Sequence, residues 1–186
     1  MSDGQRKPRP PIQEVITDLL CGDRLENALD FVAFLNELQL PPRWTATNAW
    51  TAKYKGNTIC TVRMHGVGQS NHGLANMFGL EPGSWHIGHW NSDSNLLGHL
   101  FLTHLGHYIG SMPEGAKETV WANVKRCTGC GRCTGVNKMV LGKEFQMLCR
   151  HGHLVITNPD AATLAFAKKL AECKLKYVMY SLQQGE

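Results

Sequence analysis

The chain lacks several features that would place it in a well-defined functional class. No apolar run approaches the roughly 18 residues of a membrane-spanning helix, and the N-terminus has no apolar signal core. The G-x-S-x-G motif, the P-loop, the G-x-G-x-x-G turn after a strand and H-E-x-x-H are missing, and no pair of acidic residues points to acid–base catalysis. We therefore expect a cytoplasmic protein without a membrane partner, and these absences favour a binding role over catalysis.

The composition fits a packed globular protein. Apolar residues make up 42% of the 186-residue chain, aromatic residues 8%, and the formal net charge is +4. These values exclude collagen-like, coiled-coil and wholly disordered proteins. The length suits one ordinary domain. We expect residues 1–11, which hold three prolines and three basic side chains, to form a flexible basic tail, and residues 12–186 to form a single domain.

Hydrophobic spacing predicts an α+β fold in which helices pack on a small, mostly antiparallel sheet. The expected helices lie at 12–20, 23–40, 95–109, 113–124 and after 160, and the expected strands at 49–54, 58–64, 84–90 and within 145–156. The pair Pro41-Pro42 ends the second helix, and Asn158-Pro159-Asp160 caps the last one. No internal repeat is present, which excludes a solenoid.

Cysteines gather toward the C-terminus. The chain has seven cysteines, and without an export signal clustered thiols are more typical of metal ligands than of disulfides. A C-x-x-C turn followed about 15–20 residues later by further ligands is typical of zinc ribbons and fingers. We therefore predict a structural Zn²⁺ site in a zinc-ribbon-like knuckle at 125–155. Its candidate ligands are Cys127, Cys130, Cys133, Cys149, His151 and His153.

The fourth ligand and the identity of the metal are open at this stage. Cys127, Cys130 and Cys149 are the first three expected zinc ligands, and Cys133 competes with one of the two histidines for the remaining place. The spacing C-x-x-C-x-x-C is also similar to the ligand run of bacterial ferredoxins, which favours the alternative of an iron–sulfur redox protein with a [4Fe–4S] cluster. Against this alternative, no cysteine–proline pair follows closely after Cys133. Reduced thiols that bind no metal are the remaining interpretation.

The same segment is strongly basic. Between Lys125 and Arg150, Glu144 is the one acidic residue among several basic ones. Positive side chains stabilise metal-bound thiolates, and they also attract phosphates. The sequence therefore carries a second functional hypothesis, a nucleic-acid-binding zinc module.

Aromatic residues and histidines crowd around the predicted sheet. Such residues either fill the core or line a pocket that stacks a flat or cationic ligand. The candidate pocket residues are Trp44, Trp50, Tyr54, Trp85, His86, His89 and Trp90. The sequence thus predicts a binding protein for a small molecule or a protein partner at a Trp/His-rich face. An enzyme that uses His86, His89 or His104 is a further alternative, without a nameable reaction.

The order of these motifs resembles a group of small bacterial proteins of uncharacterised function. The matching residues are Pro42-Arg43-Trp44, Trp50, Tyr54-Lys55-Gly56-Asn57, Cys127, Cys130, Leu141-Gly142-Lys143-Glu144-Phe145, Cys149 and Asn158-Pro159-Asp160. The chain departs from the group at 65–83, which is longer here, and at His151 and His153. The sheet portion is also similar to gyrase-inhibitor-like small-molecule-binding domains, a resemblance that implies fold and not function.

Overall fold

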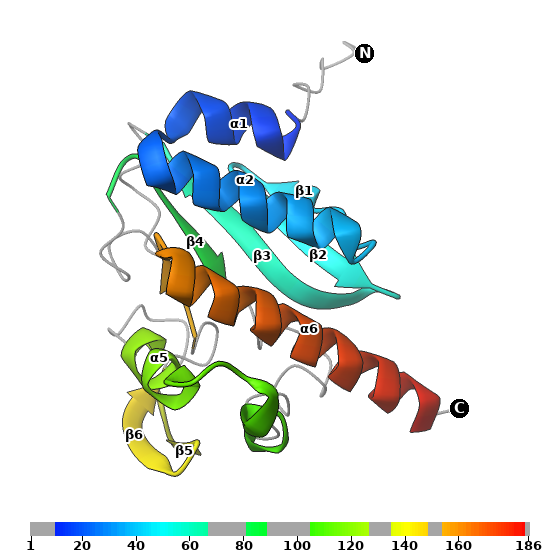
Figure 1. The fold of residues 1–186 in the computed structure, drawn as a ribbon, viewed down its shortest axis with the longest axis vertical. Helices are drawn as coiled ribbons and strands as arrows, with labels where there is room; N and C mark the ends of the chain where they lie inside the picture. The colour runs from blue at the N-terminus through cyan, green and yellow to red at the C-terminus, as the bar shows by residue number, and fades with distance from the viewer. Residues whose placement is uncertain (1–9, 67–80, 89–104, 127–134, 149–153, 185–186) are drawn as a thin grey trace, which may run out of the picture.

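The computed structural model describes residues 10–66, 81–88, 105–126, 135–148 and 154–184. Most of the expected N-terminal tail therefore lies outside the described residues. Figure 1 shows a layer of helices in front of a twisted sheet, with a smaller unit of one helix and a β-ribbon below them. None of the helices in the described ranges is both long and apolar enough to cross a membrane.

A five-stranded sheet forms the centre of the fold. Its spatial order is β1-β2-β3-β4-β7, and each neighbouring pair is antiparallel. The strands are β1 (Arg43–Ala46), β2 (Ala49–Tyr54), β3 (Asn57–His65), β4 (Ser84–Gly88) and β7 (Ile156–Thr157). Lys55 and Gly56 join β2 to β3 with φ angles of 45° and 85°, the left-handed pair that a two-residue hairpin turn requires. The predicted α+β class and mostly antiparallel sheet are confirmed.

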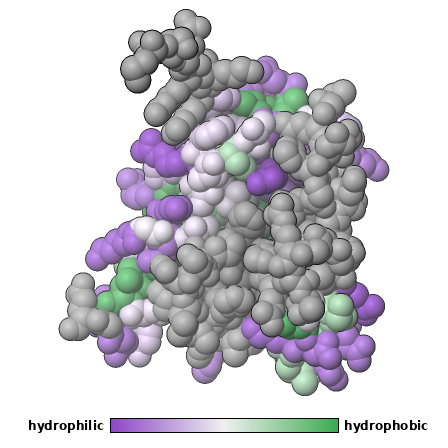
Figure 2. Space-filling model, turned by 180° about the vertical axis from the view of Figure 1, so that it is seen from behind, coloured by the Kyte–Doolittle hydropathy of each residue, from purple (hydrophilic) through white to green (hydrophobic). Residues whose placement is uncertain are grey.

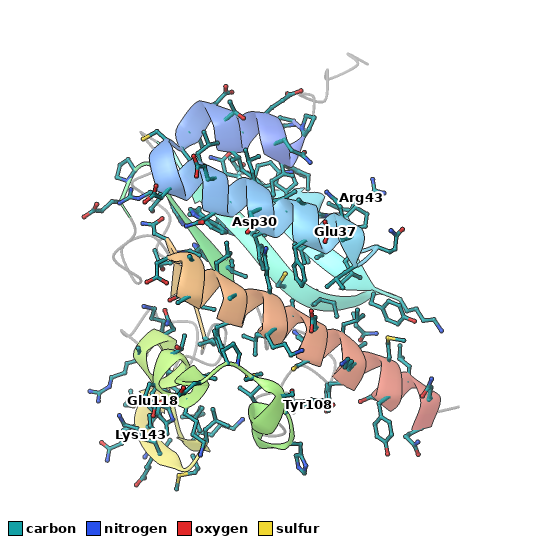
Figure 3. The ribbon with its side chains drawn as sticks, in the orientation of Figure 1. Asp30, Glu37, Arg43, Tyr108, Glu118 and Lys143 are labelled. Carbon is teal, nitrogen blue, oxygen red and sulfur yellow. The ribbon has the colours of Figure 1, made fainter. Side chains whose placement is uncertain are left out.

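Three helices cover one face of this sheet (Figure 1). They are α1 (Ile12–Leu19), α2 (Gly22–Glu37) and α6 (Ala161–Gln184). The ring of Phe31 on α2 packs against that of Trp85 on β4, with centroids 6.3 Å apart. Lys168 of α6 donates to both carboxylate oxygens of Asp30 on α2 at 2.7 Å, and Figure 3 shows Asp30 on the side of α2 that faces α6. The apolar core lies between these helices and the sheet.

The start of α6 agrees with the cap expected from the sequence. The Oδ1 atom of Asp160 accepts a hydrogen bond from the main-chain N–H of Thr163 at 2.8 Å. This bond satisfies one of the N–H groups that the first turn of a helix leaves without a partner. It also favours the ionised carboxylate, and it therefore lowers the pKa of Asp160.

A smaller unit lies beside the sheet. It contains α5 (Ala116–Asn123) and an antiparallel ribbon of β5 (Val136–Val140) and β6 (Lys143–Leu148). Leu141 and Gly142 join these strands with φ angles of 50° and 85°, the same turn geometry as in the first hairpin. The indole N–H of Trp121 donates to the carbonyl of Val140 at 2.9 Å and fixes α5 to the ribbon.

The expected helix at 95–109 is corrected in part. Residues 95–104 lie outside the described residues, and the described end forms two short 3₁₀ turns, Leu105–His107 and Ile109–Ser111. Glycines at positions 106 and 110 interrupt the helical pattern here, and glycine disfavours the α-helix. The expected third strand is confirmed from Ser84 to Gly88, while its last two residues, His89 and Trp90, lie outside the described residues.

Candidate ligand-binding face and metal site

The strand pairing divides the sheet residues between two faces. Directly opposed residues of antiparallel strands share a face, and side chains alternate along each strand. The pairs Trp50–Val62 and Val62–Ile87 therefore lie on one face, and Arg63–His86 and His86–Thr157 on the other. We call this second face the polar face, and its polar members are Arg43, Thr51, Thr61, Arg63, His65, Ser84, His86 and Thr157.

The tryptophans of the expected pocket belong largely to the core. Trp50 and Trp85 are 2% and 0% exposed on the helix-covered face. Trp44 and Tyr54 are partly buried and pack against the same core. His86, which follows Trp85 in β4, lies on the polar face instead. The structure therefore does not bring the described residues of the expected Trp/His pocket to a single face.

The polar face is centred on two histidines in direct contact. The Nε2 atom of His65 lies 2.8 Å from Nδ1 of His86, and the rings stack with centroids 5.0 Å apart. Their exposed fractions are 7% and 6%. Burial, and to a lesser extent the charge of Arg63, lower the pKa of His65 to about 4. At neutral pH the His65 ring is therefore uncharged, and an N–H···N hydrogen bond joins the two rings.

Arg63 lies next to this pair. It stands directly opposite His86 in the pairing of β3 with β4, and two residues before His65 on β3. Its side chain is partly buried, and burial lowers the pKa of the guanidinium. Within the described part of the chain, the side chain of Arg63 has no hydrogen bond and no ion pair. The guanidinium of Arg63 is thus partly removed from water without a described counter-charge.

Threonine hydroxyls surround the histidines and Arg63. Thr51 and Thr61 lie on neighbouring strands with their hydroxyl oxygens 3.0 Å apart. Thr157 stands opposite His86, and its buried Oγ1 atom has no hydrogen-bond partner. Figure 2 shows the molecule from this side, where the described atoms of the upper half are mainly pale or purple, the colours of weakly and strongly polar residues. The described residues assigned to the polar face include no aspartate or glutamate.

Of the polar members of this face, only His86 belongs to the predicted pocket. The sequence pattern that indicates this face lies in β3. There Thr61, Arg63 and His65 alternate with Val62 and Met64, which indicates a strand with one polar and one apolar face. The strand expected at 58–64 ends one residue before His65, whereas β3 includes it.

The expected metal ligands lie outside the described residues. This applies to Cys127, Cys130, Cys133, Cys149, His151 and His153. Within the described ranges, no three His, Cys, Asp or Glu side chains form a group able to hold a metal ion. The main chain on either side of the predicted metal ligands is described, and its arrangement bears on the predicted site.

The flanking main chain converges at Leu148. This residue pairs with Val136 in the β5–β6 ribbon and also forms an antiparallel bridge with Arg126. A second bridge joins Val124 to Leu154. Opposed Cα atoms in antiparallel pairs are about 4.5–5.5 Å apart. The last described residue before Cys127 thus lies beside the last described residue before Cys149.

The basic residues of the ribbon pack against neighbouring side chains. The ammonium of Lys143 lies 5.3 Å from the ring centroid of Trp121 and 5.5 Å from that of Phe145, within the range of cation–π attraction. Figure 3 places Lys143 on the ribbon next to α5. Burial lowers the pKa of both Lys125 and Lys138. The side chains of Lys125, Lys138 and Lys143 are therefore not fully available to an external anion.

The remaining cysteines behave as expected. Cys60 and Cys173 are buried, and Cys21 is exposed; all three are free thiols. Burial raises the pKa of the Cys60 thiol to about 12, although the positive charge of Lys174 opposes this shift. A thiol that stays protonated is a poor nucleophile. The buried Cys60 thus acts as a small apolar residue.

Comparison of the chain with protein-family models, curated proteins and solved structures found no match. The resemblance of its motifs to the bacterial group described above stays a prediction. The features of the described chain that bear on function are the polar face and the bridges that join Arg126 to Leu148 and Val124 to Leu154.

Proposed function

We propose that the protein binds a small ligand at the polar face of its sheet and that a zinc ion stabilises its C-terminal ribbon. The observation that carries the first part is the buried His65–His86 pair beside Arg63. Buried polar groups are costly to a fold, and uncompensated ones often mark functional sites. A ligand that completes the hydrogen bonds of Arg63 and Thr157 would explain why polar side chains lie on this face while the opposite face of the sheet is apolar.

The arrangement supports binding more directly than catalysis. Two histidines, Arg63 and several hydroxyls supply hydrogen bonds with defined directions, the usual means by which a pocket orients a small molecule. No carboxylate or thiol is found among the described residues of the polar face. The proposed ligand site thus differs from the Trp/His-rich face expected from the sequence and shares His86 with it.

The second part of the proposal concerns the ribbon. The bridge from Arg126 to Leu148 supports it, because it brings the chain entering Cys127 beside the chain entering Cys149. Four protein ligands would close the coordination sphere and make the site structural. A two-stranded ribbon buries little apolar area and therefore rarely folds alone. Metal binding would supply the missing stability. The [4Fe–4S] cluster is the alternative cofactor.

A nucleic-acid-binding module is the second candidate function. The basic residues between Lys125 and Arg150 favour it, whereas the contacts of Lys143 with Trp121 and Phe145 show that this lysine has a role within the fold. Binding to DNA or RNA with a steep dependence on salt would support the module. Absence of binding at low salt would exclude it.

Ligand binding can be tested by a thermal-shift screen of the full chain against a library of small polar metabolites. We expect compounds that raise the melting temperature of the wild-type protein and have no effect on His86→Ala. The matched control is His107→Ala, which removes an exposed histidine from a 3₁₀ turn and should keep the response. Circular dichroism verifies that both variants fold. Compounds that stabilise His86→Ala equally would place the site elsewhere.

Elemental analysis of the purified chain tests the metal. We expect one zinc per chain and a colourless solution. Iron in the protein, together with visible absorbance, would show that the site holds an iron–sulfur cluster instead of zinc. Protein that contains neither metal after purification without chelators would disprove the metal site.

A further inference from the structure

We propose that the ligand of the polar face carries an oxyanion, a carboxylate or a phosphate group, and that Arg63 binds this group. This inference rests on the proposed function, because it names the ligand class of the same site. It commits to a small anion, and it is carried by Arg63, by the two histidines and by the hydroxyl of Thr157.

Arg63 provides the first argument. A guanidinium partly removed from water is costly unless an anion or several acceptors compensate it. The described part of the chain offers Arg63 neither, and burial depresses its pKa. Arginine presents its N–H groups as a planar fork that matches the two oxygens of a carboxylate or phosphate. A bound oxyanion would supply the missing counter-charge.

The histidine pair provides the second argument. Arg63, His65 and His86 lie side by side on β3 and β4, so that positive charge and imidazole nitrogens face the same volume. The low pKa of His65 keeps further positive charge away from Arg63 while no anion is present. An anion nearby favours the protonated imidazole. The pair can therefore add an N–H donor, and charge, when an anion arrives.

The groups around the histidine pair also suit an anion. Thr157, opposite His86, contributes a buried hydroxyl oxygen without a partner, and a hydroxyl can donate to an anion. The described members of the polar face include no acidic side chain that would repel one. His65 and His86 are each less than a tenth exposed. Side chains this buried are not open to the extended backbone of a nucleic acid.

The test uses the full chain with inorganic phosphate and acetate as probes. Each is titrated at constant ionic strength, with potassium chloride as the balancing salt, and binding is followed by ¹H–¹⁵N NMR of the histidine side chains and by melting temperature. We expect saturable shifts of the His65 and His86 resonances with at least one probe. The comparison of the two probes distinguishes a phosphate from a carboxylate ligand.

Substitutions assign the effect to Arg63. We expect Arg63→Gln to weaken binding by about tenfold or more, since charged hydrogen bonds are lost. The matched control is Arg24→Gln, which removes an exposed arginine from α2, on the helix-covered side of the sheet, and should keep the wild-type affinity. Arg63→Lys, which keeps the charge without the fork, should bind with intermediate strength. The ¹H–¹⁵N NMR spectrum of the histidine side chains in Arg63→Lys also shows whether the polar face remains folded.

Two results would overturn the proposal. One is an equal response of Arg63→Gln and wild type, which would indicate a general salt effect. The other is the absence of a saturable response to either probe. In that case the proposed function still stands if the metabolite screen yields an uncharged ligand that depends on His86. If that screen also finds nothing, both proposals fail together.

Discussion

Asn158 and Trp85 exchange two hydrogen bonds between the start of α6 and strand β4. The main-chain N–H of Trp85 donates to Oδ1 of Asn158 at 2.9 Å, and the main-chain N–H of Asn158 donates to the carbonyl of Trp85 at 3.0 Å. Asn158 holds a φ angle of 42°, in the left-handed region that asparagine tolerates better than most residues. This exchange explains the asparagine of Asn158-Pro159-Asp160 and fixes where α6 meets the sheet.

Substitution of Asn158 should therefore be costly. We expect Asn158→Ala to lower the free energy of unfolding by about 2 kcal/mol, since it leaves the N–H of Trp85 without its acceptor and disfavours the left-handed backbone. Asn158→Asp keeps an acceptor oxygen and should lose less. Urea denaturation of the three proteins measures the difference. Equal losses in both variants would show that the side-chain acceptor is unimportant.

The contact of His65 with His86 predicts a pH dependence of stability. The pKa of His65 is about 4 in the folded protein and about 6.5 in an unfolded chain. The unfolded state therefore binds the proton first as the pH falls, so stability is complete above pH 6.5 and declines toward pH 4. The charged or titratable groups that face His65 are Arg63 on its own strand and His86 on β4. We expect the loss to reach about 2–3 kcal/mol.

The His65→Gln variant isolates this effect. Its free energy of unfolding should decline less between pH 7 and pH 4.5 than that of the wild type, measured by urea denaturation at each pH. Comparison of the two proteins removes the contribution of groups that both contain, including metal ligands. The variant His107→Gln should follow the wild-type curve. Parallel curves for His65→Gln and wild type would contradict the assignment.

The partly buried guanidinium of Arg63 predicts a gain in stability on its removal. In buffer without phosphate or carboxylate, Arg63→Met should raise the free energy of unfolding by about 1 kcal/mol, because methionine keeps the apolar stem and removes a desolvated charge. Arg43→Met, at the exposed edge strand, should change it by less than about 0.5 kcal/mol. Urea denaturation checks both values. A destabilised Arg63→Met would mean that Arg63 stabilises the fold itself.

The convergence of the chain at Leu148 predicts how the protein responds to loss of a cysteine. We expect Cys130→Ser and Cys149→Ser to lose the zinc and to lower the free energy of unfolding by several kcal/mol. Cys21→Ser is the control, since Cys21 is exposed on the connection between α1 and α2. It should keep both the metal and the melting temperature. Metal retained in Cys149→Ser would remove Cys149 from the site.

The fourth zinc ligand can be identified in the same way. Cys133→Ser, His151→Ala and His153→Ala are compared by zinc content after gel filtration. We expect one of the three to lose most of its zinc and the other two to keep it. If all three keep their zinc, the fourth ligand lies elsewhere in the chain.

The elements that sequence predicted well are those with a strong local pattern. Helices α1 and α2 follow from apolar residues at helical spacing before Pro41, and α6 follows from its Asp160 cap. The hairpin of β2 and β3 follows from its Lys55-Gly56 turn. In each case one short stretch of sequence holds both the periodicity and the signal that ends it.

The parts that sequence did not predict depend on distant contacts. Strand β1 has four residues and a register shift, so that no local period marks it. The position of Trp85 in the core and of His86 on the polar face depends on pairing with β3. The importance of Arg63 could not be inferred either, because its lack of a described partner is visible only in the folded chain.

The β5–β6 ribbon lies in sequence between the first four strands of the sheet and the last strand and helix, which has a consequence for biosynthesis. The ribosome releases α1 through β4 first, while β7, Asn158 and α6 follow only after the ribbon. Until then the apolar side of the sheet on which Trp50 and Trp85 lie lacks the cover that α6 provides. A nascent chain that pauses before residue 158 would present that surface to chaperones, which bind exposed apolar segments.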